Sequence, residues 1–350
     1  MLQASFKKHT LQFKTPGGTS RGVLKSKDSW FIFVWDESNP DVKGIGECSI
    51  IRGLSVDPWQ EFDSILKKLM ADISNHKWWM EEGLITFPAI RFGLETALKD
   101  LEKGGQRLLF PSAFSEGKQA IPINGLVWMG EFDFMRKQII EKIENGFHCI
   151  KLKIGAINFE EELSLLKLIR KDFNEKELEL RVDANGAFTA QEALEKLNQL
   201  AELKVHSIEQ PIRQNQWNEM ARLCEVSPVP IALDEELIGI HYEPVLRKML
   251  TVIRPQYIIL KPSLLGGWER SEMFIREAKK QNIGWWVTSA LESNVGLNAI
   301  AQWTATLNNP LPQGLGTGQL FTNNIPSPLH IQKAQLFYNP QANWDLTLIE

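Results

Sequence analysis

From about residue 120 onward, short apolar runs recur with starts about 24 to 31 residues apart, and segments of helical periodicity lie between them. The runs are Ile121–Val127, Cys149–Ile154, Leu180–Ala184, Val205–Glu209, Val229–Leu233, Tyr257–Lys261, Trp285–Ser289 and Gln313–Thr317. Apolar residues spaced three and four apart predict helices over 132–143 and 190–203, the second with Thr189 as its N-cap. Alternating strands and helices are typical of an α/β protein with a parallel sheet.

The positions of the charged residues favour a barrel over an open sheet. The eight runs predict a modified (β/α)8 barrel of the TIM type, with a doubly wound open sheet as the alternative. Charged residues stand at or near the ends of at least five runs. A barrel brings those ends to one point, whereas an open sheet spreads them along an edge. The Gly-x-Gly-x-x-Gly signature of dinucleotide binding is absent, because residues 314–318 read only Gly-Leu-Gly-Thr-Gly.

Residues 1–119 have a different texture and predict an α+β capping domain packed beside a barrel over residues 120–326. Ser29–Asp36 is an aromatic, strand-like run, and helical stretches follow it. We expect the segment 327–350 to pack back on the cap. Two cap loops rich in Gly and Arg, at 17–22 and 49–55, are predicted to form a lid over the barrel mouth.

Lys151 and Lys153 stand two residues apart in the second run. Alternate residues of a strand face the same side, so we expect both to point into one space. An unperturbed lysine has a pKa of about 10.4, and nearby positive charge lowers it toward that of a usable base. Taken alone, the pair also fits a solvated edge strand.

Three carboxylates stand at the ends of the next three runs: Asp183, Glu209 and Asp234, at spacings of 26 and 25 residues. Each alone fits a helix cap or a surface ion pair, but three in succession predict one shared site. Carboxylate oxygens are ligands that Mg²⁺ prefers. Asn185 shares the face of Asp183, and Glu235 is predicted to support the site from behind.

Lys261 ends the sixth run, across the predicted barrel from the lysine pair. Amines on two sides of a metal-bound carboxylate can address both faces of a planar intermediate. Removing a proton from the carbon next to a carboxylate leaves an enediolate, whose charge a divalent metal stabilises. The pattern therefore predicts metal-assisted proton abstraction from carbon.

Composition argues against several other classes. A net charge of −4 and a pI of about 6.0 do not indicate a nucleic-acid surface. No apolar run of about 18 residues predicts a membrane helix, and the first ten residues lack the apolar core of a signal peptide. The 3 cysteines are widely spaced, which favours free thiols in a reducing cytoplasm over disulfides or a zinc site.

Lys-x-Lys, Asp-x-Asn, Glu, Asp-Glu and Lys on strands two to six resemble the muconate-lactonizing-enzyme subgroup of the enolase superfamily, over essentially the whole chain. Within it, the chain is most similar to the o-succinylbenzoate synthase family, through residues 46–55, 261–267, 289–293 and 314–318. This resemblance implies a Mg²⁺-dependent hydro-lyase of menaquinone biosynthesis, with Mn²⁺ as a substitute. The implied reaction dehydrates 2-succinyl-6-hydroxy-2,4-cyclohexadiene-1-carboxylate to o-succinylbenzoate.

The resemblance also implies roles for individual residues. The three strand-end carboxylates would bind Mg²⁺. Lys153 would remove the α-proton and, as its conjugate acid, help hydroxide leave from the same face. Lys151 would support the substrate carboxylate, and Lys261 would lie over the ring in a cation–π contact.

Substrate contacts are less sharply indicated. In the cap loops, an arginine or serine can reach the succinyl carboxylate, and backbone N–H groups of the last glycine-rich turn can cradle an anion. Each also fits a solvated loop or a bare turn. The candidates are Ser20, Arg21, Arg52, Ser289, Gly316 and Thr317.

Rival functions are an N-succinyl or N-acylamino acid racemase or a dipeptide epimerase of the same subgroup, because two lysines across a plane suit a 1,1-proton transfer. Dipeptide epimerases usually carry Asp-x-Asp after the eighth strand. Residues 316–319 read Gly-Thr-Gly-Gln, which counts against the epimerase but not the racemase.

Muconate cycloisomerase is a further member of the subgroup and a further rival. A non-catalytic binding barrel predicts loss of a lysine or carboxylate, and all six are present. The expected partner is a small carboxylate, with neither nucleic acid nor membrane, and the oligomeric state is left open.

Overall fold

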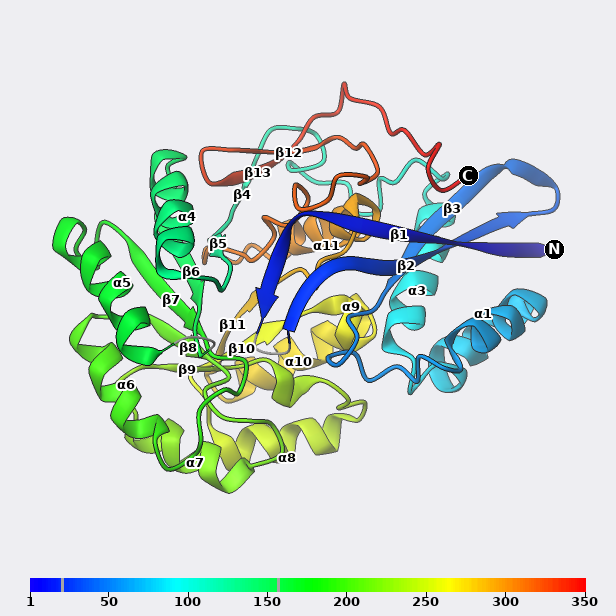
Figure 1. The fold of residues 1–350 in the computed structure, drawn as a ribbon. Helices are drawn as coiled ribbons and strands as arrows, with labels where there is room; N and C mark the ends of the chain where they lie inside the picture. The colour runs from blue at the N-terminus through cyan, green and yellow to red at the C-terminus, as the bar shows by residue number, and fades with distance from the viewer. Residues whose placement is uncertain (20–21, 156–157) are drawn as a thin grey trace.

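The structure is a computed structural model that describes residues 1–19, 22–155 and 158–350 (Figure 1). Within these residues, seven parallel strands curl into most of a barrel, in the order β11-β10-β9-β8-β7-β6-β5, with helices along their outer side. The strands are β5 (Gly125–Val127), β6 (Cys149–Lys153), β7 (Glu179–Asp183), β8 (Ser207–Glu209), β9 (Ile231–Leu233), β10 (Tyr257–Leu260) and β11 (Gly284–Val287). The helices are α4 (Phe132–Glu144), α5 (Phe159–Asp172), α6 (Ala193–Glu202), α7 (Trp217–Val226), η3 (Glu235–Leu237), α8 (Glu243–Ile253), α9 (Pro262–Leu265), α10 (Trp268–Lys280) and α11 (Asn294–Thr306).

The eighth position of the barrel differs from the sequence-based expectation. A full strand over Gln313–Thr317 was predicted, but no strand forms there among the described residues. Instead, Gly314 forms a parallel bridge to Thr288, and Gln313 forms another to Ile123. Prolines before this segment and glycines within it explain the difference, because proline lacks an N–H donor and glycine has low strand propensity.

The first predicted run also divides. Ile121–Pro122 forms β4, which pairs with β13 (Gln335–Tyr338), while β5 pairs with β6. Together β12 (Leu329–Gln332), β13 and β4 form a small antiparallel sheet beside the barrel. The chain therefore leaves one sheet and enters another within a single apolar run, which periodicity alone does not reveal.

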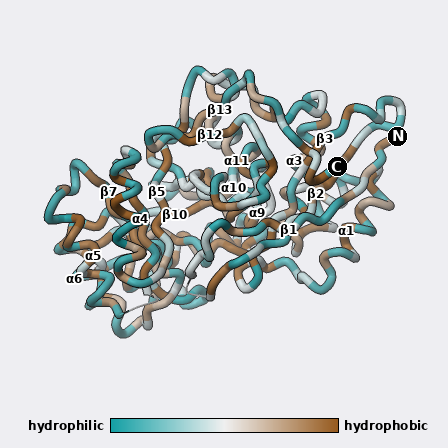
Figure 2. Tube along the Cα trace, turned by 45° about the horizontal axis from the view of Figure 1, so that its top comes forward, coloured by the Kyte–Doolittle hydropathy of each residue, from teal (hydrophilic) through white to brown (hydrophobic). Residues whose placement is uncertain are grey.

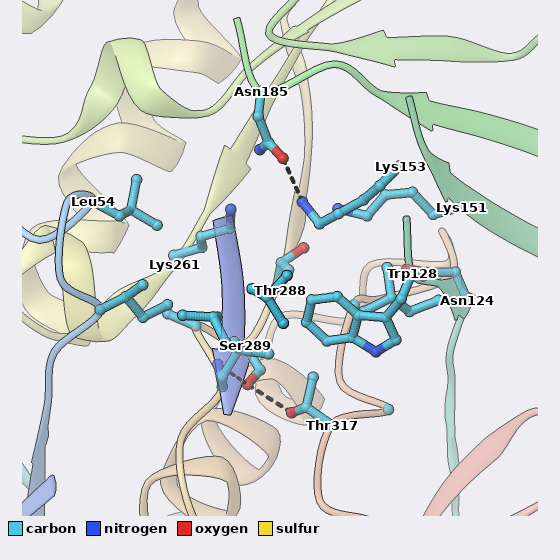
Figure 3. Close-up of a pocket in the computed structure, with 18 of the residues that line it drawn as sticks. Leu54, Asn124, Trp128, Lys151, Lys153, Asn185, Lys261, Thr288, Ser289 and Thr317 are labelled. Carbon is cyan, nitrogen blue, oxygen red and sulfur yellow. Dashed lines mark hydrogen bonds between the residues drawn. The ribbon is translucent and has the colours of Figure 1, made fainter. Parts of the chain in front are cut away.

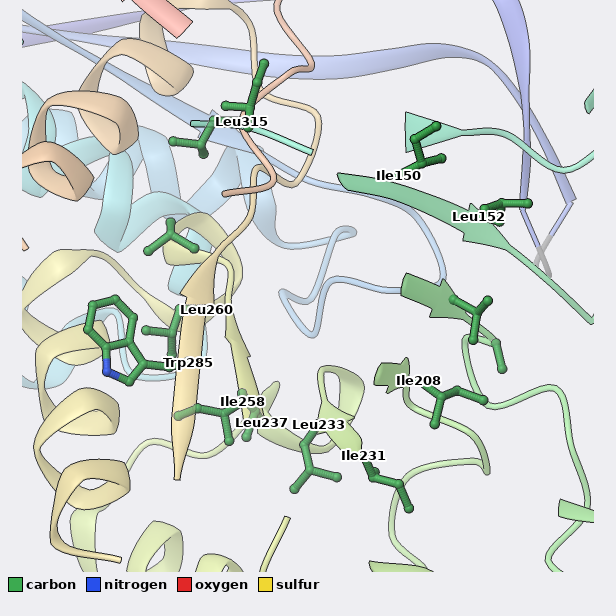
Figure 4. Packing of buried hydrophobic residues seen from close by; sticks show 14 of the residues in the cluster. Ile150, Leu152, Ile208, Ile231, Leu233, Leu237, Ile258, Leu260, Trp285 and Leu315 are labelled. Atoms are coloured by element: carbon green, nitrogen blue, oxygen red, sulfur yellow. The ribbon is translucent and has the colours of Figure 1, made fainter. Parts of the chain in front are cut away.

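Alternation along the barrel strands separates the core from the site. Ile150 and Leu152 on β6 are buried and belong to the large apolar cluster with the helices, whereas Lys151 and Lys153 take the opposite face (Figures 3 and 4). Burying one such aliphatic side chain contributes about 1.5–3 kcal/mol. The hydropathy colouring shows hydrophobic segments inside the barrel layers and hydrophilic ones along the outer loops (Figure 2).

The cap is an antiparallel sheet with helices packed on it. Its elements are β1 (Leu2–Thr19), β2 (Gly22–Asp36), β3 (Asn39–Ser49), α1 (Phe62–Ala71), η1 (Ile73–Asn75), α2 (His76–Trp78), η2 (Trp79–Gly83) and α3 (Pro88–Glu102). Helix α3 lies directly on β3 because Gly46 has no side chain. A Cβ there would lie 1.8 Å from the Gly93 carbonyl oxygen. This close approach fixes the cap sheet to the helix that also contacts α9 of the barrel.

The end of the chain lies against the cap sheet. Ile349 and the half-buried Trp344 pack on Phe31, Phe33 and Ile45. The domain boundaries at residues 119 and 326 stay a prediction. No helix in the described part of the chain is both long and apolar enough to cross a membrane.

Two local expectations need correction. Residues 17–19 and 22–24 pair as the end of the β1–β2 hairpin rather than forming an irregular loop. Thr189 is not the N-cap of α6, which begins at Ala193 with Glu192 at its N-cap. Thr189 and Glu192 instead exchange hydrogen bonds between side chain and backbone one turn earlier. These two bonds close the turn that leads into α6.

Candidate active site

The strand-end residues meet because neighbouring parallel strands end in register. Lys153 lies opposite Asp183, and Asp183 lies opposite Glu209. Asp234 directly follows β9, and Lys261 directly follows β10. The side chains lie at the carboxyl ends of the strands, the usual place for the active site of such barrels.

In the structure, lysine ammonium groups bridge the carboxylates. The Nζ atom of Lys151 lies 2.6 Å from Glu209 Oε2 and 3.2 Å from Asp183 Oδ2. The Nζ atom of Lys261 donates to Asp234 Oδ2 and lies 3.5 Å from Glu209 Oε1. Glu209 therefore sits between two ammonium groups, in the middle of the site.

All three carboxylates are buried. The exposed fractions of Asp183, Glu209 and Asp234 are 0%, 2% and 1%. Burial alone would raise the pKa of Asp183, but the nearby lysines hold it below its usual value. Burial raises the pKa of Asp234 well above its usual value, and the negative charges of Glu235 and Glu209 act in the same direction. Two carboxylates forced together in this way favour a cation between them.

Burial alone shifts the pKa of an amine downward, opposite to its effect on a carboxyl group. Burial alone would lower the pKa of Lys151, but Glu209 and Asp183 raise it above its ordinary value. Burial likewise opposes the charge of Lys261, and Asp234 and Glu209 again outweigh it, so that its pKa is raised. The amines of Lys151, Lys153 and Lys261 thus each lie against one or two of the three buried carboxylates.

The donor set fits a divalent metal held by oxygen ligands. Three carboxylates from successive strand ends supply only oxygen, which suits Mg²⁺. As they stand, no three Asp, Glu, His or Cys groups in the described residues converge closely enough to hold a metal ion. The reason is local, because the Nζ atoms of Lys151 and Lys261 lie between neighbouring carboxylates.

Asn185 links the front of the site to Glu235. Lys153 Nζ lies 2.8 Å from Asp183 Oδ2 and 2.7 Å from Asn185 Oδ1. The amide nitrogen of Asn185 donates to Glu235 Oε1 at 3.0 Å. Asn185 has a φ of 45°, in the left-handed region that asparagine tolerates, and its N–H donates to Asp183 Oδ1. This turn holds Lys153 at the edge of the carboxylate group.

A cavity opens above these groups and is lined by all three lysines (Figure 3). The cap closes one side through Leu24, Ile51, Arg52 and Leu54. Of the two predicted lid segments, 49–55 contributes Ile51, Arg52 and Leu54 to the lining, and 17–22 contributes Gly22. Arg52 is mostly exposed. Its Nη2 atom lies 3.5 Å from Asp28 Oδ2, and its guanidinium group lies over the Trp59 ring.

The other predicted substrate contacts divide into two groups. Ser20 and Arg21 lie outside the described residues. Ser289, Gly316 and Thr317 line the cavity. However, the hydroxyl of Ser289 donates to buried Glu292, and that of Thr317 donates to Ser289.

Some residues that line the cavity were missed by the sequence reasoning. They are Asn124 and Trp128 near β5, Leu54 in the cap, Leu291, and Thr288 directly after β11. Thr288 directly precedes Ser289, so its strand-end position was the available signal. Asn124 gave no signal, because it falls between two short strands that were read as one.

Comparison with known proteins identifies the family. The enolase C-terminal domain-like family matches residues 135–336. A curated o-succinylbenzoate synthase from Desulfotalea psychrophila is 48% identical over 361 residues, covering 94% of this chain and 97% of that protein. The chain belongs to the o-succinylbenzoate synthase family of the enolase superfamily. Both the fold class and the family expected from the sequence are therefore confirmed.

Solved structures of the superfamily agree. The crystal structure of MenC from Desulfotalea psychrophila superposes with a TM-score of 0.85 at 44% identity, covering 96% of this chain and 99% of that one. A dipeptide epimerase from Cytophaga hutchinsonii, solved with Mg and a dipeptide, has a TM-score of 0.84 at 21% identity over 100% of this chain and 98% of that one. The second likeness shows the shared fold alone.

Proposed function

We propose that this chain dehydrates 2-succinyl-6-hydroxy-2,4-cyclohexadiene-1-carboxylate to o-succinylbenzoate, in menaquinone biosynthesis and in the cytoplasm. The single observation that carries the proposal is the 48% identity to a curated o-succinylbenzoate synthase over nearly the full length of both chains. The site agrees with it, because the Lys-x-Lys pair, three carboxylates and a further lysine meet at one mouth.

Lys153 is the proposed base. Lys153 lines the cavity, and its side chain is 12% exposed, against 7% for Lys151 and 10% for Lys261. As the free amine, Lys153 takes the proton from the carbon next to the ring carboxylate. As the resulting ammonium, it returns that proton to the departing hydroxyl group, so water leaves and the ring becomes aromatic.

Lys151 and Lys261 are proposed to hold charge rather than to shuttle protons. Both are buried and hydrogen-bonded to Glu209 or its neighbours. Lys151 lies beside Lys153 and faces the substrate carboxylate. Lys261 enters from the opposite strand, where its positive charge lies over the ring and stabilises the electron-rich intermediate.

Asp183, Glu209 and Asp234 are the proposed ligands of Mg²⁺, with Mn²⁺ as a substitute. When bound, the metal would neutralise charge that develops on the substrate carboxylate as its α-proton leaves. A bound metal would replace the contacts that Lys151 and Lys261 make with these carboxylates. Both lysines also line the cavity.

The direct test is an ultraviolet assay with the cyclohexadiene substrate and Mg²⁺, with EDTA added to a parallel sample. We expect the diene absorbance to fall with Mg²⁺ and the reaction to stop when the metal is chelated. Absence of turnover, together with deuterium exchange at the α-carbon of N-succinyl amino acids, would move the function to the racemase.

A further inference from the structure

The wall of the cavity formed by β5, β11 and the segment between them carries polar groups that the proposed chemistry does not use. Thr288 follows β11, and Asn124 precedes β5. Gly314 lies next to Thr288 through a parallel bridge, and its neighbour Gln313 accepts a hydrogen bond from the Asn124 N–H. All three of Asn124, Thr288 and Gly314 line the cavity, and Figure 3 shows Asn124 and Thr288 at the same opening as the lysines.

The hydroxyl of Thr288 has a proton to donate. Thr288 is 7% exposed, and its Oγ1 atom is buried without a hydrogen-bond partner in the part of the chain that the structure describes. Leaving a buried hydroxyl without a hydrogen-bond partner is unfavourable, so its position in this cavity points to a ligand partner.

The neighbouring hydroxyls are committed elsewhere. A hydroxyl has one proton to donate. Ser289 donates to Glu292 Oε2, at 2.5 Å, and Thr317 donates to Ser289 Oγ, at 2.7 Å. Of these three hydroxyls, only that of Thr288 keeps its proton for a ligand.

Asn124 adds a second polar group on the other side of Gly314. It is 5% exposed, and its side-chain amide forms no hydrogen bond with any residue that the structure describes. Gly314 keeps the space between them open, because a Cβ at residue 314 would lie 2.5 Å from Thr288 Oγ1. The result is a recess with an amide on one side, a hydroxyl on the other and only backbone between.

We propose that this recess binds oxygen atoms of the succinyl side chain of the substrate, with Thr288 and Asn124 as hydrogen-bond donors. The inference rests on the proposed function. The strand-end carboxylates lie at the carboxyl ends of β7, β8 and β9, so a ring carboxylate held there would leave the rest of the substrate to extend toward β11 and β5. Thr288 and Asn124 are thus specificity-determining residues, separate from the lysines that move the proton.

The test compares Thr288→Val, which keeps the shape and removes the hydroxyl, with Thr288→Ser, which keeps the hydroxyl. Thr304→Val is the matched control, because Thr304 is a buried threonine on α11 whose hydroxyl donates within its own helix. Dissociation constants for o-succinylbenzoate are measured with Mg²⁺ present, by tryptophan fluorescence, alongside KM, kcat and Mg²⁺ affinity.

Thr288→Val is expected to weaken product binding and raise KM by about tenfold, with kcat and Mg²⁺ affinity nearly unchanged. Thr288→Ser and Thr304→Val are expected to stay within about twofold of wild type. Asn124→Leu is expected to act like Thr288→Val. Wild-type affinity in Thr288→Val, or equal losses in the valine and serine variants, would overturn the proposal that the recess binds the succinyl side chain. Absence of wild-type turnover would instead refute the proposed function.

Discussion

Glu209 should be a sensitive carboxylate when no divalent metal is present, because the amines of Lys151 and Lys261 contact it from two sides of the barrel. The perturbation is Glu209→Gln, which removes the charge and keeps the shape. The two amines lie 2.6 Å and 3.5 Å from its oxygens, and Glu209 is 2% exposed. With an effective dielectric constant of about 20, each contact is worth on the order of 5 kcal/mol before desolvation.

Desolvation cancels much of that attraction, and breaking one buried pair costs about 3–5 kcal/mol in measured proteins. Lys151 keeps Asp183 and Lys261 keeps Asp234 in the variant. We therefore expect a loss near the lower end, about 3 kcal/mol of unfolding free energy.

The assay is urea unfolding in EDTA, followed by tryptophan fluorescence. Glu236→Gln is the matched control. Glu236 is also buried, but it accepts hydrogen bonds from the Asn215 N–H and the Gln210 amide and forms no ion pair with any described residue. Glu236→Gln should lower the unfolding free energy by about 1 kcal/mol. Equal midpoints for the two variants, or a wild-type midpoint for Glu209→Gln, would refute the bridged arrangement.

Three further predictions concern the base, the pH response and the cap. Lys153→Ala and Lys261→Ala should each lower turnover by at least about a thousandfold with an unchanged circular dichroism spectrum, and normal turnover in either would contradict its role. Burial raises the pKa of Asp57 from 3.8 to about 7. The folded carboxyl therefore keeps a proton that the unfolded chain has lost, and stability should fall by up to about 4 kcal/mol as pH rises from about 4 to 7. Asp57→Asn should remove this fall in urea melts at pH 5 and pH 8, and an unchanged pH response would exclude Asp57 as its source. Gly46→Ala should lower the unfolding free energy measured in urea by about 3 kcal/mol, because its Cβ meets the Gly93 carbonyl oxygen, and wild-type stability would show that α3 can shift away.

The sequence predicted the central strands well for a physical reason. Residues of β6 alternate between a helix-covered face and the barrel interior, so Lys151 and Lys153 stand out between Ile150 and Leu152. The same logic predicted that Asp183, Glu209 and Asp234 end consecutive strands, and the structure places them together. Their role as metal ligands stays a prediction.

The first and eighth strands were harder to predict because local breakers decide them. Pro122 divides the first run, and the glycine-rich segment after Pro312 leaves only isolated bridges at the eighth position. Side-chain hydrogen-bond partners could not be predicted from the sequence at all. Ser289 looked like a ligand contact, but its hydroxyl donates a hydrogen bond to Glu292. The folded network leaves the Thr288 hydroxyl without a partner among the described residues.

The measurement that tests the account most directly is turnover of the cyclohexadiene with saturating Mg²⁺ by wild type and by Asp183→Asn, Glu209→Gln and Asp234→Asn. We expect wild type to form o-succinylbenzoate and each variant to lose at least about a thousandfold in kcat/KM, because each lacks one charged oxygen ligand. Full activity in any of the three would contradict the assignment of the strand-end carboxylates as the metal site. An inactive wild type would contradict the function itself.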